Sequence, residues 1–135
     1  MPAADGAPRS GRREGGDQAI AVTPAAARRS VGELLERAGV SLNSVVAADA
    51  LMVTTELVTN ALRHGGGLTL FRIAITDNVL HLSVGDASSL APALRPPSPG
   101  RLGGYGWPLI QQLAEHVGIT ALPDGKIINA VLRLA

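Results

Sequence analysis

Three consecutive glycines, Gly65-Gly66-Gly67, divide this chain of 135 residues into a helical first half and a second half made mostly of strands. Glycine is a poor helix former and readily adopts positive φ angles, so three in a row end a helix decisively. Before the run, apolar residues repeat with the period of a helix. After it, they alternate with the two-residue period of strands. This change of period predicts an α+β fold.

Two helices are expected before the glycine run. Thr23-Pro24 supplies an N-cap followed by proline at the first helical position, and Gly39 supplies a C-cap for that helix. A second helix is expected to begin near residues 41–44 and to reach Arg63 or His64.

The N-terminal segment is expected to stay outside the folded domain. Residues 1–17 are rich in Gly, Ala, Pro and Arg and show no apolar periodicity, which predicts a disordered tail. Residues 18–22 predict a short strand, so the domain is expected to cover residues 18–135.

The second half predicts two hairpins and one more helix. Asp77-Asn78 suits a tight turn between strands at 68–76 and 79–85. The expected elements after that turn are a proline-rich loop at 87–102, a helix from Trp107-Pro108 to Val117 closed by Gly118, and strands at 119–122 and 126–134 around Asp124-Gly125. The predicted architecture is a two-layer α+β sandwich, with a mixed, mostly antiparallel sheet covered on one face by three helices.

Composition narrows the classes of function. Phe71, Tyr105 and Trp107 are the only aromatic residues, which argues against single-strand nucleic-acid binding through stacking platforms. A net charge of +1 gives no strong electrostatic footprint for DNA or RNA. The chain has no cysteine, so disulfides and thiolate metal sites are excluded. No apolar run was expected to approach the roughly 20 residues of a membrane span, and no secretory signal is apparent, so a cytoplasmic protein is expected.

The second predicted helix carries a polar pair at one border of its apolar face. Glu56 and Asn60 are four residues apart and therefore lie on the same side of a helix. A carboxylate and an amide placed in this way can share one ligand or metal site. The spacing alone is more typical of a solvated glutamate and a boundary amide than of a site. His64 alone is likewise more typical of a residue favoured by the helix dipole than of a catalytic histidine.

Two further segments can contact a ligand. Asp86-Ala87-Ser88 ends a strand, where a carboxylate can accept a hydrogen bond from an exocyclic amine or simply form a turn. Gly103-Gly104-Tyr105-Gly106 precedes a helix, where glycines let the backbone approach an anion and direct N–H groups toward it.

The order of these segments resembles the GHKL ATPase superfamily, which includes gyrase, sensor histidine kinases and anti-sigma-factor serine kinases. Residues 56–64 resemble its N box, and residues 86–88 its first glycine box in the anti-sigma version. Residues 104–110 resemble its second glycine box, and Gly118-Ile119 with Gly125-Lys126 resemble the ending of small bacterial members. The resemblance covers residues 18–134.

The resemblance implies a Bergerat ATP-binding fold that uses ATP and Mg²⁺. Glu56 would be the general base, Asn60 would coordinate Mg²⁺, and Asp86 would hold the adenine amine. The other residues implied to contact the nucleotide are His64, Ser88, Arg101, Gly104 and Gly106. The implied partners are a sigma factor, an anti-anti-sigma protein or both, with no direct contact to nucleic acid or membrane, and a homodimer is compatible with the resemblance.

One departure from the pattern leaves the activity open. Trp107 and Pro108 stand where the second glycine box usually continues with leucine and another aliphatic residue, so a bulky ring and a missing N–H lie near the expected phosphate path. The leading hypothesis is an ATP-binding anti-sigma-type regulator that phosphorylates a serine or threonine of an antagonist protein. The alternatives are a non-catalytic partner-binding module with a degenerate ATP site, the catalytic domain of a sensor histidine kinase, and an unrelated α+β domain.

Overall fold

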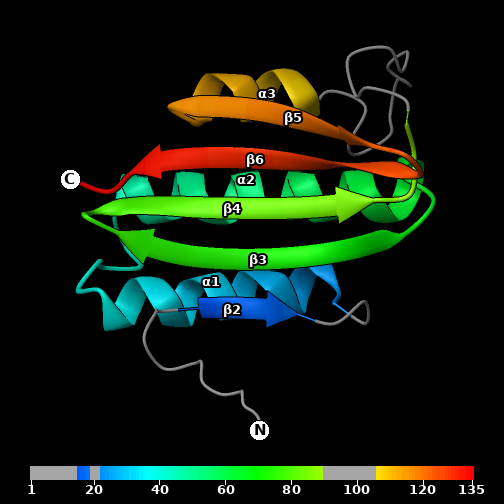
Figure 1. Ribbon diagram of the computed structural model, residues 1–135. Helices are drawn as coiled ribbons and strands as arrows, with labels where there is room; N and C mark the ends of the chain where they lie inside the picture. Colours follow the sequence, from blue (N-terminus) through cyan, green and yellow to red (C-terminus); the bar gives the residue numbers. More distant parts are fainter. Residues whose placement is uncertain (1–14, 19–21, 90–105) are drawn as a thin grey trace, which may run out of the picture.

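A five-stranded antiparallel sheet forms one layer of the structure (Figure 1). The computed structural model describes residues 15–18, 22–89 and 106–135, and of residues 15–18 only the backbone. The strand order is β2-β3-β4-β6-β5, and each pairing between neighbours is antiparallel. The strands are β2 (Gly15–Gln18), β3 (Leu68–Thr76), β4 (Val79–Asp86), β5 (His116–Leu122) and β6 (Gly125–Arg133).

The second layer consists of the helices α1 (Pro24–Arg37), α2 (Val45–His64) and α3 (Gly106–Leu113), which cover one face of the sheet (Figure 1). Thr23 caps α1 by accepting a hydrogen bond from the Ala26 N–H at 3.0 Å. Ser44 caps α2 in the same way through the Ala47 N–H at 3.1 Å. These contacts satisfy N–H groups that the first turn of a helix leaves without a partner. The predicted helix starts and the predicted α+β sandwich are confirmed.

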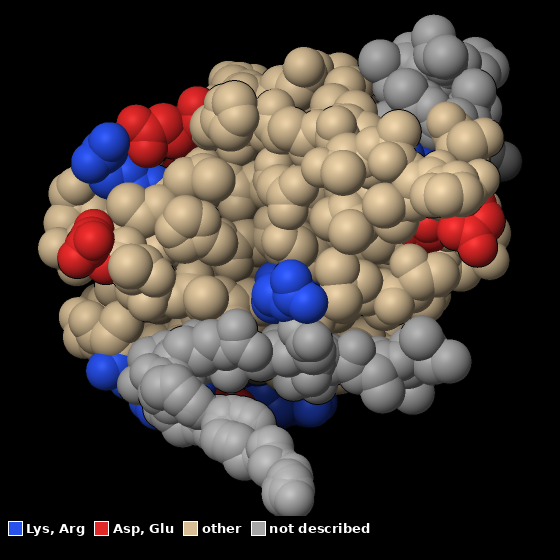
Figure 2. Space-filling model, viewed as in Figure 1, with Lys and Arg blue, Asp and Glu red and all other residues tan. Residues whose placement is uncertain are grey.

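Helix α2 lies at the centre of the helical layer and contacts α1, α3 and the sheet. Its buried face carries Val53, Leu57 and Val58, which pack with Phe71 of β3 and Leu82 of β4 in a core that is almost entirely aliphatic. The burial of this apolar surface is what holds the helices against the sheet. The opposite face of the sheet is not covered by a helix, and few of its visible described side chains are charged (Figure 2).

The turn between β3 and β4 forms as the sequence predicts. Asp77 and Asn78 both adopt positive φ, at 54° and 62°, which is the backbone of a two-residue turn that matches the twist of the strands. Asp and Asn tolerate this conformation better than most residues. The turn fixes the register of β3 against β4. On the other side of β4, the pairing with β6 places Asp86, the last residue of β4, opposite Lys126.

Helix α3 is shorter than the sequence predicts. We expected it to continue to Val117 and to end at Gly118, but it ends at Leu113, and both of those residues belong to β5. The Glu115 N–H donates to the Val131 carbonyl at 2.8 Å, which starts the pairing with β6. The β-branched residues that follow favour a strand, and a paired strand satisfies the backbone groups that a longer helix would have used.

The first strand also differs from its prediction. We expected a strand at 18–22 and a tail over 1–17, whereas β2 spans Gly15–Gln18 and pairs with residues 71–74 of β3. Three residues assigned to the tail therefore join the sheet. The rest of the predicted tail, residues 1–14, and most of the predicted proline-rich loop, residues 90–102, lie outside the described residues.

By length and composition alone, α2 could cross a membrane, which the sequence analysis did not anticipate. This observation is weak evidence for a membrane span, because the core helix of a globular domain passes the same test. In this fold α2 carries Asp49 and Glu56 and lies between α1 and α3 with its apolar face against the sheet, so its apolar residues are explained by the core.

Candidate functional site

Two side-chain oxygens on neighbouring turns of α2 lack the hydrogen-bond partner that burial normally requires. Glu56 Oε1 and Asn60 Oδ1 are buried, and neither accepts a hydrogen bond within the described part of the chain. Asn60 is 3% exposed. Leaving a buried acceptor unpaired costs about 1–3 kcal/mol, so two such atoms one turn apart indicate a site that a ligand completes. The predicted pairing of these residues on one helix face is confirmed, although Asn60 is buried rather than at a half-exposed border.

The first residue of α3 lies against this pair. A Cβ atom placed on Gly106 would collide with Glu56 Oε1 and would lie 3.0 Å from Glu56 Cδ. Glycine therefore lets the start of α3 come this close to the carboxyl group, which any side chain at this position would have to displace. The backbone N–H groups of a first helical turn have no partner within the helix and favour an anion. Glu56, Asn60 and the N-terminus of α3 thus form one site.

Trp107 and Pro108, which depart from the usual second glycine box, do not make the close contact with Glu56. Trp107 is half-buried and packs against the hydrophobic core, so its ring contributes to the helical layer. Pro108 is exposed in the first turn of α3, where its missing N–H would have lacked a helical partner in any case. The close backbone approach falls on Gly106 instead.

Burial raises the pKa of Glu56 above its ordinary value of 4.5, because a dry environment disfavours the charged carboxylate. The positive charge of Arg63, two turns further along α2, lowers the pKa and offsets part of this effect. A carboxylate with a raised pKa holds a proton more strongly once it accepts one, which is the property a general base needs.

A second polar cluster surrounds Asp86 at the end of β4. Its Oδ1 atom accepts hydrogen bonds from Lys126 Nζ and from the Ser88 N–H, both at 2.9 Å. Lys126 Nζ also donates to the Ser88 carbonyl at 3.2 Å. Asp86 is 4% exposed and Lys126 is 2% exposed, so this ion pair is almost completely removed from water.

Two glycines shape the space around Asp86. A Cβ atom on Gly65, which follows α2 directly, would lie 2.5 Å from Asp86 Cγ and 2.6 Å from Asp86 Oδ2. A Cβ atom on Gly125 would collide with the Asp86 carbonyl oxygen. The Ala87 N–H donates to the Gly65 carbonyl at 2.8 Å. The end of α2 and the end of β4 are therefore held together, and both clusters lie along the last turns of one helix.

The sequence analysis missed the role of Lys126 and treated Gly65 only as a helix terminator. A signal for Lys126 was present in β6, because Ile128, Ala130 and Leu132 are buried and residues two apart share one face of a strand. Lys126 has the same parity as these core residues, so its ammonium group had to be buried. A buried ammonium requires an acidic partner, and Asp86 lies opposite it in the register.

The structure describes two of the other predicted site residues, His64 and Ser88. His64 is the last residue of α2 and is half-buried. Ser88 contacts Asp86 and Lys126 through its backbone N–H and carbonyl. Arg101 and Gly104 lie outside the described residues. Among the described residues no group of three or more His, Cys, Asp or Glu side chains could hold a metal ion by itself.

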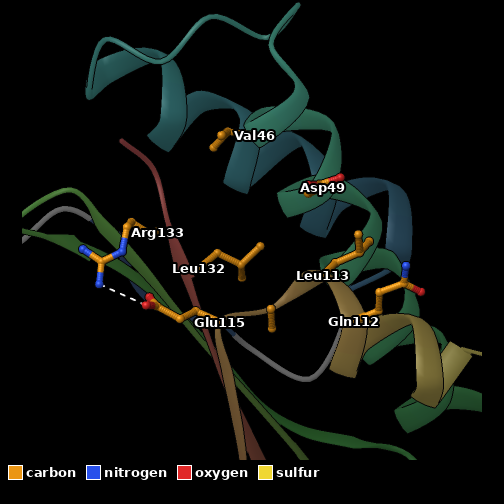
Figure 3. A pocket seen from close by; sticks show the side chains of 8 residues that line it. Val46, Asp49, Gln112, Leu113, Glu115, Leu132 and Arg133 are labelled. Atoms are coloured by element: carbon orange, nitrogen blue, oxygen red, sulfur yellow. Dashed lines mark hydrogen bonds and ion pairs between the residues drawn. The ribbon is translucent and has the colours of Figure 1, made fainter.

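Two hollows among the described residues lie elsewhere or only touch this site. One, of about 350 Å³, lies between the first half of α2, the end of α3 and the end of β6, and contains none of the predicted site residues (Figure 3). Its ionisable lining residues are Asp49, Glu115 and Arg133, and Arg133 is paired with Glu115 at 3.0 Å. An acidic excess of this kind disfavours phosphates. A hollow of about 310 Å³ between α1 and α2 includes Glu56 in its lining.

Comparisons with known proteins agree with this arrangement. The family model for the histidine kinase-like ATPase domain matches residues 19–132. A histidine kinase domain from the Erythrobacter litoralis EL346 blue-light activated histidine kinase aligns with a TM-score of 0.50 and 21% identity, over 82% of this chain and 60% of that chain. A structure of the Erythrobacter litoralis EL346 blue-light activated histidine kinase aligns with a TM-score of 0.49 and 24% identity, over 66% of this chain and 30% of that chain.

This protein therefore spans less than two thirds of both solved structures, and the first of them supports the fold alone. No curated protein matches the sequence. The family model, in contrast, covers most of the chain, from just before α1 to nearly the end of β6. The chain belongs to the family of histidine kinase-like ATPase domains, within the GHKL superfamily that its motifs resemble.

Proposed function

We propose that this protein is an ATP-binding regulator of the anti-sigma type that phosphorylates a serine or threonine of an antagonist protein. The observation that carries the proposal is the pair of buried, unpartnered oxygens, Glu56 Oε1 and Asn60 Oδ1, beside the start of α3. In an ATPase-domain fold, two oxygen acceptors without hydrogen-bond partners beside the N-terminus of a helix are suited to bind a metal-bound phosphate.

The residues present fit ATP and Mg²⁺. Asn60 Oδ1 is a hard oxygen ligand without a partner, and Mg²⁺ favours such ligands and is commonly held by one or two side chains together with substrate phosphates. The lack of a three-ligand acidic cluster among the described residues agrees with this mode of binding. Gly106 would offer its backbone N–H group to phosphate, and Asp86 would contact the base. When bound, ATP supplies the phosphoryl group that is transferred.

Glu56 is placed to act as the general base. Its raised pKa makes its carboxylate a stronger proton acceptor than an exposed glutamate, and its position beside Asn60 puts it next to the proposed phosphate site. It would accept the proton of a serine or threonine hydroxyl. Phosphoryl transfer depends mainly on positioning and on stabilisation of charge, so these few groups suffice.

Titration calorimetry with Mg-ATP tests the nucleotide site. We expect Asn60→Ala to abolish Mg-dependent binding, because it removes the oxygen proposed to hold the metal. Thr59→Ala, which changes the neighbouring residue on the other side of the helix, is the matched control and should bind like the wild type. Unchanged Mg-ATP affinity in Asn60→Ala would count strongly against the proposal.

A second candidate function is a partner-binding module with a degenerate ATP site. The buried Lys126 ammonium favours it, because it already occupies Oδ1, one of the two Asp86 oxygens that a base amine could have used. Labelled ATP separates the two candidates. Stoichiometric transfer of the γ-phosphate to a partner serine or threonine, lost in Glu56→Gln, would eliminate the module, whereas partner binding without transfer would eliminate the kinase.

The proposal includes a sigma factor, an anti-anti-sigma protein or both as partners, a cytoplasmic location, and no direct contact with nucleic acid or membrane. The modest net charge of +1 supports the expectation about nucleic acid. Co-purification with a sigma factor would support the partner assignment, and tight DNA binding by the isolated protein would contradict it. Size-exclusion chromatography with light scattering tests whether the protein also forms a homodimer.

A further inference from the structure

Lys126 is the only lysine in the chain, since every other basic residue apart from the histidines is arginine. It is 2% exposed, yet it carries a charged ammonium group. A buried ammonium needs acceptors for its three N–H groups. Within the described residues Nζ donates to two, Asp86 Oδ1 and the Ser88 carbonyl. One strong donor is therefore left over inside the protein.

Asp86 presents the complementary group. Its Oδ1 atom takes both hydrogen bonds that the carboxylate receives from described residues, and its Oδ2 atom lies against the Gly65 backbone. A carboxylate oxygen accepts more than one hydrogen bond when it is ionised. The buried pair thus offers one unused donor on Lys126 next to one unused acceptor on Asp86.

We propose that Lys126 is a specificity-determining residue of the base pocket and that, with Asp86, it lets the pocket accept 6-oxopurine as well as 6-aminopurine nucleoside triphosphates. The inference rests on the proposed function, which places the nucleobase at Asp86.

The hydrogen-bonding groups at positions 1 and 6 of the purine explain why the pocket should accept both types of base. A 6-aminopurine shows an amine donor beside the N1 acceptor, and a 6-oxopurine shows a carbonyl acceptor beside the N1–H donor. Each edge offers one donor and one acceptor to the donor and acceptor of the buried pair. A lone carboxylate would face the carbonyl of a 6-oxopurine without a proton between them and would reject it. The ammonium group supplies that proton.

Titration of the wild type with Mg-ATP and Mg-ITP tests the inference, because ITP differs from ATP only at the six position and in the proton at N1. We expect the two dissociation constants to agree within roughly tenfold, the ratio that one well-placed hydrogen bond can produce. In Lys126→Met the preference for ATP over ITP should increase by about tenfold or more, because the donor for the carbonyl is gone. Arg133→Met, which changes an exposed basic residue, should leave the ratio unaltered.

A spectroscopic measurement on the wild type covers the case in which Lys126→Met does not fold. Protein labelled with ¹⁵N-lysine has a single side-chain ammonium signal, which needs no assignment because the chain has one lysine. We expect this signal to shift on addition of either nucleotide. If ATP binds while ITP does not and the ammonium signal stays in place, the inference is overturned and the proposed function stands. If neither nucleotide binds, the proposed function fails, and the inference fails with it.

Discussion

The two polar clusters beside the last turns of α2 are built in opposite ways. Asp86, Lys126 and Ser88 are joined by three hydrogen bonds, in a space bounded on two sides by Gly65 and Gly125. Glu56 Oε1 and Asn60 Oδ1 are equally dry but accept no hydrogen bond within the described residues. The first cluster joins β4, β6 and the end of α2, whereas the second holds no elements together.

This difference separates a structural contribution from a functional one. A buried, hydrogen-bonded ion pair is strongly destabilising to break, because one charge is then left alone in a dry environment. A buried acceptor without a partner already costs stability, and a protein keeps such an atom where a ligand completes it. Substitutions in the two clusters should therefore affect stability to different extents, and binding of the metal-bound phosphate should depend on the second cluster in particular.

The largest effect is expected from breaking the cluster of Asp86, Lys126 and Ser88, which we call the closed cluster. Asp86→Ala leaves the Lys126 ammonium buried without its carboxylate, which should lower the free energy of unfolding by about 3–5 kcal/mol. Arg133→Ala removes an exposed ion pair with Glu115 and should cost about 1 kcal/mol or less. Urea denaturation of both variants measures the contrast. Equal losses in the two variants would show that the buried pair is no more important to the fold than a surface pair.

A smaller effect is expected where α3 meets the pair of Glu56 and Asn60, which we call the open cluster. In Gly106→Ala the new methyl group must displace the Glu56 carboxyl group, so we expect a loss of about 1 kcal/mol, as for other cases of overpacking. Gly32→Ala in α1 is the matched control, since its Cβ would come no closer than 3.9 Å to Leu42. It should gain about 1 kcal/mol from the higher helix propensity of alanine. Thermal unfolding of the two variants would contradict this account if both changed in the same direction.

The parts of the fold that depend on neighbouring residues could be predicted from the sequence. Thr23 and Asp77-Asn78 act through hydrogen bonds or backbone angles within a few residues, and each forms the cap or turn that was expected. The pairing of Glu56 with Asn60 follows from their spacing on one helix in the same way. The sequence therefore predicts that these two residues share one helix face, whereas their role as a ligand site rests on the family resemblance.

The parts that depend on distant residues were not predictable in the same way. Asp86 and Lys126 are separated by 40 positions, and they meet only because the strand register places them opposite each other. The early end of α3 has a similar origin, because pairing of β5 with residues 125–131 of β6 competes with further helix for the same backbone groups. Local helix signals say nothing about this competition. The closed cluster and the boundary at Leu113 therefore needed the tertiary structure.

The smallest expected effect concerns the charge of the open cluster and its dependence on pH. Burial raises the pKa of Glu56 in the folded state, so the folded protein holds this proton more strongly than the unfolded chain does. The resulting stability is fully present below the unfolded pKa near 4.5 and is lost as the pH rises through the folded pKa. The Glu56→Gln variant has no charge to bury at this position. The stability of the variant should therefore not fall as the pH rises through the folded pKa of Glu56.

We therefore expect Glu56→Gln to melt at a higher temperature than the wild type at about pH 8 and at nearly the same temperature at about pH 4, where the wild-type carboxyl group is mostly protonated as well. Glu115→Gln, which changes an exposed glutamate paired with Arg133, should show no such gain at high pH. Melting curves over this range at constant ionic strength make the comparison. A gap between Glu56→Gln and the wild type that does not change with pH would mean that the cost of the open cluster does not come from the Glu56 charge.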